Sequence, residues 1–181
     1  MSNTEKYERF RALHVPGDPV ILYNIWDVGS ALAVAKAGAR ALATGSHPVG
    51  DASGFGDAQQ VPLDFVFANA RRIVDAVDPL PLTGDFEGAY STDPEEGGRN
   101  VARLKESGAV GCNFEDQVIG GEGVHPIELQ VERMHALPAD HLILEIAAGR
   151  AARLGRCDIA AAFLRIGRVG AFEIDRQWQR V

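Results

Sequence analysis

The segment PLTGDFEGAY, residues 81–90, ends a short apolar run with two carboxylates that stand two positions apart. If residues 82–87 form a strand, Asp85 and Glu87 point to the same side of the sheet, because strand side chains alternate between the two faces. Like charges held that close repel each other. The pair therefore indicates either an exposed strand end or a site that binds a divalent cation.

Strand-like and helix-like patterns alternate along the chain on both sides of this segment. The apolar runs that predict buried strands are residues 20–24, 40–46, 80–87 and 109–116. The segments whose apolar residues recur at helical spacing are 27–39, 62–77, 94–108 and 126–137, after a short N-terminal helix around Tyr7, Phe10 and Leu13. Ser30 is the expected cap of the helix over 27–39, and residues 47–61 are expected to form a glycine-rich loop.

Polar side chains stand at the carboxyl end of every one of these expected strands. Strict alternation of strands and helices implies an α/β fold with parallel strands joined by crossover helices. In a (β/α)8 barrel or an open α/β sheet, binding and catalytic groups gather at the carboxyl ends of the strands. The residues at those ends are Asn24, Ser46, Asp85 with Glu87, and Glu115 with Asp116.

The acids at the third and fourth strand ends are suited to a hard metal ion. Asp85, Glu87 and Glu115 supply oxygen ligands of the kind that Mg²⁺ prefers, and Asp57 in the loop GFGDAQQ is a fourth candidate. Mn²⁺ accepts the same oxygen set, whereas zinc is disfavoured without histidine or thiolate alongside. The alternative is that these acids cap neighbouring helices or pair with arginines.

The segment ATGSHPVG raises the question of serine chemistry. Ser46 is next to His47, but adjacent residues of an extended segment point apart, which argues against a Ser–His catalytic pair. The backbone N–H groups of the Gly45–Ser46–His47 turn are better suited to bind an anionic group of a substrate.

Composition and charge exclude several partners. The 181 residues are 46% hydrophobic and 24% charged, as in ordinary soluble domains. A formal net charge of -7 argues against nucleic acid and anionic membranes, which are polyanions. No apolar run approaches the ~20 residues that span a bilayer, and the charged N-terminal segment lacks the apolar centre of a secretory signal. We therefore expect a cytoplasmic protein with reduced thiols at Cys112 and Cys157.

Four motifs, N-x-W-D-x-G-S-A, T-G-S, D-x-E-G-x-Y and N-x-E-D, occur in this order and at spacings that resemble the isocitrate lyase/phosphoenolpyruvate mutase superfamily. The similarity runs from about Phe10 to about Met134. It implies a (β/α)8 barrel, usually oligomeric, that binds Mg²⁺ and a small α-keto acid or its enol form. It also implies reactions that make or break C–C or P–C bonds beside pyruvate.

The resemblance also implies roles for individual residues. Asp85 would bind Mg²⁺ directly, and Asp57, Glu87 and Glu115 would hold the water molecules around it. Ser46 and the His47 amide would bind the substrate carboxylate beside Gly45. The pocket floor would be formed by Asn24 and Asp27.

Two features depart from the family pattern. The loop after the fourth strand, QVIGGEGVHPIELQ, has neither the lysines nor the cysteine of the lyases and phosphonate mutases. The C-terminal part, rich in arginine and alanine, does not align, and the arginine that the family carries on its fifth strand is missing from HLILEIAA. We expect residues 1–137 to form the N-terminal part of the barrel with the metal site and residues 138–181 an atypical segment of the same domain.

A full barrel takes about 250 residues, so an incomplete one with about four to six parallel strands and a tendency to form homo-oligomers is expected. The segment 141–148 is a candidate strand and 157–169 a candidate helix.

Three functions follow from these observations. The first is a Mg²⁺-dependent lyase that cleaves a C–C bond of a small α-keto or 2-hydroxy dicarboxylic acid through a metal-stabilised pyruvate enolate. The second is a catalytically inactive, truncated family member that binds at most a metal and a small anion. The third is an acidic α/β interaction domain without a metal, which requires the motif match to be accidental.

Overall fold

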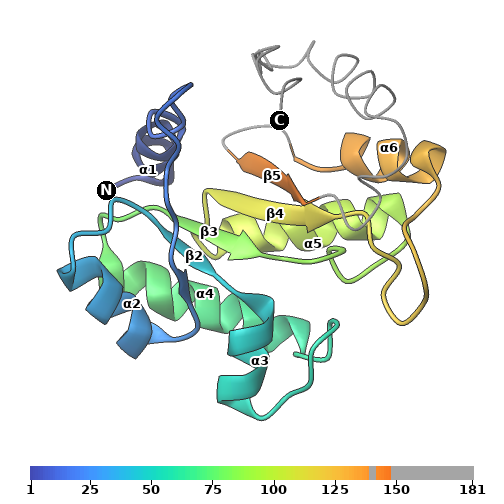
Figure 1. Cartoon of the computed structure of the whole chain (residues 1–181), viewed down its shortest axis with the longest axis horizontal. Helices are drawn as coiled ribbons and strands as arrows, with labels where there is room; N and C mark the ends of the chain where they lie inside the picture. Colours follow the sequence, from blue (N-terminus) through green and yellow to red (C-terminus); the bar gives the residue numbers. More distant parts are fainter. Residues whose placement is uncertain (139–141, 148–181) are drawn as a thin grey trace.

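The described residues form a parallel β-sheet whose strands lie side by side in chain order (Figure 1). The computed structural model describes residues 1–138 and 142–147, and of residues 143–147 only the strand that they form. The strands are β1 (Asn24–Ile25), β2 (Leu42–Thr44), β3 (Leu82–Asp85), β4 (Gly111–Glu115) and β5 (Ile143–Ala147). Each strand pairs in parallel with the next one along the chain. This is the strand order of a (β/α)8 barrel, here with five strands in the described residues, which confirms the expected fold class.

The helices follow the strands as expected from the alternating pattern. They are α1 (Asn3–Arg11), α2 (Val28–Lys36), α3 (Ser46–Ser53), α4 (Leu63–Val77), α5 (Pro94–Glu106) and α6 (Ile127–His135). In α4 the buried residues Ala70, Ile73, Val74 and Val77 share one face, because they recur three and four positions apart. That face joins the same apolar core as the strand residues of β2, β3 and β4. Cys112 also belongs to this core.

Three local predictions were wrong. The run over residues 20–24 forms a strand only from Asn24, because its register with β2 begins there, and Ile21 is 73% exposed. The cap of α2 is Asp27 and not Ser30, whose own side chain instead returns a hydrogen bond to the Asp27 carbonyl. Helix α3 includes Ser46, which was expected to end a strand, and residues 47–53, which were expected to form a loop. Gly54 ends this helix in the left-handed conformation (φ 77°).

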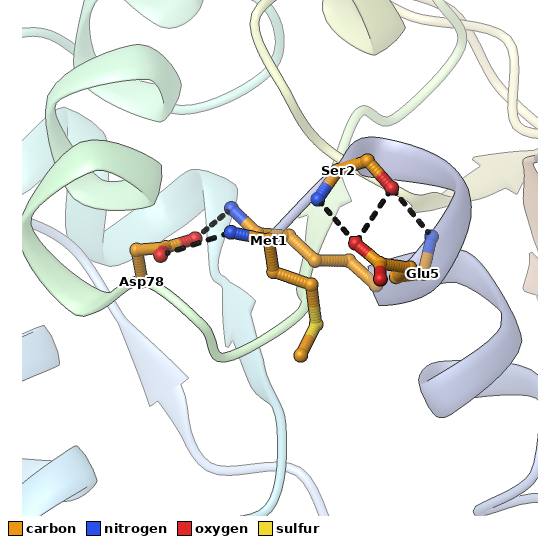
Figure 2. Close-up of polar contacts among 5 residues, drawn as sticks. Met1, Ser2, Glu5 and Asp78 are labelled. Carbon is orange, nitrogen blue, oxygen red and sulfur yellow. Dashed lines mark hydrogen bonds and ion pairs between the residues drawn. The ribbon is translucent and has the colours of Figure 1, made fainter.

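Helix α1 is fixed to the end of α4 through Asp78 (Figure 2). The Lys6 ammonium lies 2.7 Å from one Asp78 carboxylate oxygen, and the Met1 amino group lies 3.3 Å from the other. These two cations lower the pKa of Asp78, with the Lys6 hydrogen bond as the larger cause. At the start of α1, Ser2 and Glu5 cap each other reciprocally, which satisfies two backbone N–H groups.

Most of the C-terminal segment, including Cys157 and the expected helix over 157–169, lies outside the described residues. The strand expected within 141–148 is present as β5. Within the part of the chain that the structure covers, no helix has the length and apolar character needed to cross a bilayer.

Two adjacent glycines of α5 provide a test of how closely α5 and α6 pack. A Cβ atom at Gly98 would lie 2.3 Å from the Ala136 carbonyl oxygen, whereas one at Gly97 would have its nearest neighbour, the Ala89 Cβ, at 3.8 Å. Alanine favours a helix over glycine by up to about 1 kcal/mol, so Gly97→Ala should stabilise the protein. Gly98→Ala should instead destabilise it by about 1–3 kcal/mol, because a backbone oxygen must move. Urea unfolding of both variants measures the difference, and equal midpoints would show that α6 does not pack as described.

Candidate metal and substrate site

Asp85 is the last residue of β3, and its carboxylate is held from one side only. Its backbone N–H donates to Thr44 Oγ1 at 2.9 Å, which fixes the strand end. Its Oδ2 accepts a hydrogen bond of 2.7 Å from the backbone N–H of Ser46, the first residue of α3. Its Oδ1 is buried and has no hydrogen-bond partner among the described residues. One carboxylate oxygen is therefore anchored while the other remains available to a ligand.

Glu87 reaches the site from a turn and not from a strand. The strand predicted over residues 80–87 ends at Asp85, and Glu87 has a left-handed backbone conformation with φ of 48°. The conclusion that strand alternation aligns the two acids is therefore wrong. The residue is only 5% exposed, and its Oε2 is buried without a hydrogen-bond partner in the described part of the chain.

The surroundings of Glu87 make its charged form unfavourable. The pKa of Glu87 is raised to about 7, chiefly by burial and then by the negative charges of Asp85, Asp57 and Glu115, in that order. A hydrogen bond from the Gln59 backbone N–H opposes the increase. The four predicted metal-site acids therefore act on one another electrostatically, as groups that share a site do.

Glu115 closes the site from the neighbouring strand β4. Its backbone N–H donates to the Glu87 carbonyl at 2.8 Å, so the end of β4 is joined directly to the turn after β3. Burial raises the pKa of the half-buried Glu115 carboxyl, and Asp85, Asp116 and Asp57 raise it further. The position of Glu115 is thus set by a backbone contact that the sequence motif does not reveal.

Asp57 and His47 lie at the exposed rim. His47 Nδ1 is 3.5 Å from Asp57 Oδ2, and the two side chains are 65% and 57% exposed. The other ring nitrogen of His47 lies 3.2 Å from Asp51 Oδ2. The His47 side chain therefore faces acids of its own segment, which leaves its backbone as the group suited to an anionic substrate.

Of the predicted pocket residues, Asn24 and Gly45 lie close together, and Asp27 caps helix α2. A Cβ atom at Gly45 would lie 2.9 Å from Asn24 Nδ2, so glycine permits this close approach. The Asp27 carboxylate accepts a hydrogen bond of 2.7 Å from the Ser30 backbone N–H, and hydrogen bonds from Ser30 lower its pKa. Asp27 lines a cleft beside Trp26 and Arg72. Ser46 and Asp85 line a different, smaller cavity, which does not include Asp27.

Polar residues one strand away complete the site, and their roles were not predicted. Thr44 Oγ1 accepts from the Asp85 N–H, and Asn113 Oδ1 accepts a hydrogen bond of 2.9 Å from the Phe86 N–H. Both residues belong to the quoted motifs T-G-S and N-x-E-D. A polar residue at a half-buried strand position next to a predicted site is the signal that would have identified them.

The donor set fits a hard divalent cation with few direct protein ligands. Within the described residues, no group of three or more His, Cys, Asp or Glu side chains forms a ready metal cage. Asp85 Oδ1 and Glu87 Oε2 are nevertheless buried oxygens without hydrogen-bond partners, beside further acids. Mg²⁺ typically keeps several waters and takes only one or two carboxylates, which agrees with this arrangement.

Comparisons with known proteins agree with this geometry. A family model for phosphoenolpyruvate phosphomutase matches residues 10–154. A solved Burkholderia cenocepacia protein, provisionally assigned as a phosphonomutase, is 35% identical with a TM-score of 0.80, and the match covers 93% of this chain and 70% of that one. Two uncharacterized proteins of Mycobacterium tuberculosis are 35% identical over 109 residues, which is 59% of this chain. The matched region spans only 40% of the length of these curated relatives.

Two more distant structures share the fold. A 2,3-dimethylmalate lyase of the phosphoenolpyruvate mutase/isocitrate lyase superfamily is 20% identical with a TM-score of 0.75 over 93% of this chain and 61% of its own. A phosphonopyruvate hydrolase in complex with oxalate and Mg²⁺ is 18% identical with a TM-score of 0.76 over 92% of this chain and 60% of its own. At these identities the similarity shows the fold alone.

Proposed function

Because the chain belongs to the phosphoenolpyruvate phosphomutase family, we propose that it is a Mg²⁺-dependent lyase that cleaves a C–C bond of a small α-keto or 2-hydroxy dicarboxylic acid. The observation that carries this proposal is the pair of buried carboxylate oxygens, Asp85 Oδ1 and Glu87 Oε2, without hydrogen-bond partners in the described residues. Buried charge without a partner is costly, and a bound cation removes that cost. Mn²⁺ suits the same ligands.

The residues divide into metal-binding and substrate-binding groups. Asp85 would bind the cation directly, and Asp57, Glu87 and Glu115 would hold its water ligands. When bound, Mg²⁺ polarises a substrate carbonyl and stabilises the negative charge that develops on its oxygen. The Ser46 hydroxyl and the His47 backbone N–H, at the start of α3, would bind the substrate carboxylate, since first-turn N–H groups of a helix have no partner within the helix. Asn24 and Gly45 would shape the adjoining wall.

The loop between β4 and α6 supports an oxaloacetate-like substrate. It contains neither lysine nor cysteine, which disfavours isocitrate-type cleavage and the phosphonate rearrangement. The related structures carry names of a lyase and of a hydrolase, and one of them binds oxalate, a dicarboxylate, with Mg²⁺.

We also propose a cytoplasmic homo-oligomer, and sedimentation velocity that reports only a compact monomer would contradict the oligomer.

A catalytically inactive protein that binds metal and a small anion is the second candidate. The observation in its favour is the sequence of β5, Ile143–Ala147, which reads ILEIA and has no arginine. The resemblance places a substrate-binding arginine on that strand. Release of pyruvate from oxaloacetate-like acids distinguishes the two functions, because an inactive protein binds without turnover.

Thermal unfolding with Mg²⁺ and oxalate tests the site directly. A ligand that binds only the folded state stabilises it by mass action, about 2.7 kcal/mol at a hundred times its Kd. For a chain of this size we expect the melting temperature to rise by about 5–10 °C when both components are present. Each component alone should give a smaller rise. A well-folded sample whose melting temperature does not change would show that the acids form no working site.

A further inference from the structure

The turn that carries Glu87 has an unfavourable backbone conformation. Glu87, Ala89 and Tyr90 have φ values of 48°, 56° and 58°, so three non-glycine residues within four positions adopt the left-handed region. Side chains in this region meet the following carbonyl, and such conformations persist only where surrounding contacts hold them. The mutual repulsion of Glu87, Asp85 and Glu115 adds a second force that opposes this arrangement.

Arg133 of α6 holds the turn by its backbone carbonyls. Its side chain is almost completely buried, with 2% exposure. Its Nη2 donates to the Gly88 carbonyl at 2.8 Å and to the Ser91 carbonyl at 3.3 Å. Its Nη1 donates to Gln130 Oε1 at 2.6 Å, and its Cζ lies 4.8 Å from the centre of the Phe114 ring. The guanidinium therefore has a fixed orientation when it reaches the turn.

Two further side chains hold the same turn from other directions. In the amide orientation that satisfies both groups, Gln59 Oε1 accepts from the Gly88 N–H at 2.9 Å and from the Tyr90 N–H at 3.2 Å. Asn100 of α5 donates to the Ala89 carbonyl at 3.0 Å. Gly88 lies between Gln59 and Arg133, because a Cβ atom there would be 3.1 Å from the Gln59 side-chain amide and 3.2 Å from Arg133 Nη2.

We propose that Arg133 is a positioning residue that fixes the turn over residues 86–91 and thereby keeps the Glu87 carboxylate beside Asp85. Among the described residues its three hydrogen bonds go to two backbone carbonyls and one amide oxygen, so the guanidinium orders the acidic site without occupying the oxygens of Glu87. A planar fork of donors can span these acceptors, whereas a lysine ammonium on a flexible stem cannot do so equally well. This role rests on the proposed metal-binding function, but whether Arg133 holds the turn can be tested without a metal.

Hydrogen exchange of the metal-free protein measures directly whether Arg133 holds the turn over residues 86–91. We expect Arg133→Lys and Arg133→Met to speed exchange of the amides in residues 86–91 by about tenfold or more, because hydrogen bonds from a charged donor are lost. Exchange in α2 should stay unchanged. Arg103→Met is the control, since Arg103 also stacks on a phenylalanine, Phe67, at 4.4 Å, while its hydrogen bond within the described residues goes to Asp64 and not to the turn. Exchange that rises evenly along the chain, or equally in the control, would reduce Arg133 to a general stabilising residue and overturn the proposal.

Calorimetric titration of the same variants with Mg²⁺ and oxalate supplies the second measurement. Loss of a residue that orients metal-binding groups typically weakens metal binding by about 10–100-fold, and we expect Arg133→Lys to fall in this range. A loosened turn with unchanged affinity would also overturn the proposal. If the protein without substitutions binds neither Mg²⁺ nor oxalate, the proposed function fails. The exchange measurement still decides whether Arg133 holds the turn.

Discussion

Replacing Asp85 with asparagine should lower the rate of pyruvate release from an oxaloacetate-like acid by at least about 10²–10³-fold, the usual cost of removing one group that stabilises developing charge. Asparagine has nearly the same shape and can still accept the hydrogen bond that Ser46 donates to Oδ2. It lacks the negative charge, and the buried Oδ1 position can then become an amide nitrogen that cannot bind a cation. The fold should therefore survive while metal-dependent turnover is lost.

Asp51→Asn is the matched control for this experiment. Asp51 carries the same charge and lies near the site, but its carboxylate is 68% exposed and its Oδ2 lies 3.2 Å from His47 Nε2. Its variant should keep nearly full activity. Equal losses in the two variants would point to the general negative field of the region, and full activity of Asp85→Asn would remove Asp85 from the mechanism.

Replacing Glu87 with glutamine should make the metal-free protein more stable at pH 8, by about 3 kcal/mol. The pKa of Glu87 is raised from 4.5 to about 7 in the folded protein, and each unit corresponds to about 1.4 kcal/mol. Because the folded state binds this proton more tightly than the unfolded state, the stabilisation is fully present below about pH 4.5 and is lost as the pH rises through about 7. Glutamine carries no charge, so its variant escapes that loss.

Urea unfolding in the presence of a chelator, at pH 5 and at pH 8, measures this effect. The advantage of Glu87→Gln should grow between the two pH values and should shrink when Mg²⁺ is added to the unsubstituted protein. Glu95→Gln serves as the control, since the Glu95 side chain is 87% exposed. A Glu87 variant that is less stable at pH 8 would mean that its carboxylate has a stabilising partner in the folded protein.

The fold could be predicted from the sequence because it depends on patterns that the sequence displays. Alternating apolar runs and helical spacing are local, and parallel crossover connections follow from them. The position of Asp85 followed in the same way, since the end of a buried strand is visible as a change from apolar to polar residues.

The conformation around Glu87 and the helix-capping role of Asp27 could not be predicted. The first depends on contacts with residues distant in sequence, and the second on which of two local roles the side chain takes. A left-handed backbone at glutamate has no sequence signal, and the contacts that hold it come from Gln59, Asn100 and Arg133. Asp27 was assigned to the pocket by its motif, but aspartate is also a strong helix cap, and in the structure its side chain caps α2.

The chain-order arrangement of the sheet has a consequence for how the protein folds during synthesis. Each strand from β2 to β5 pairs with the strand that precedes it in the chain. When one of these strands is synthesised, a strand with which it pairs has therefore already been made. The first pairing joins Asn24 to Ala43 and the last begins by joining Gly111 to Ile143, so each step closes a loop of modest length and similar entropic cost. The sheet can therefore grow from its N-terminal edge as the ribosome releases the chain, one strand and helix at a time.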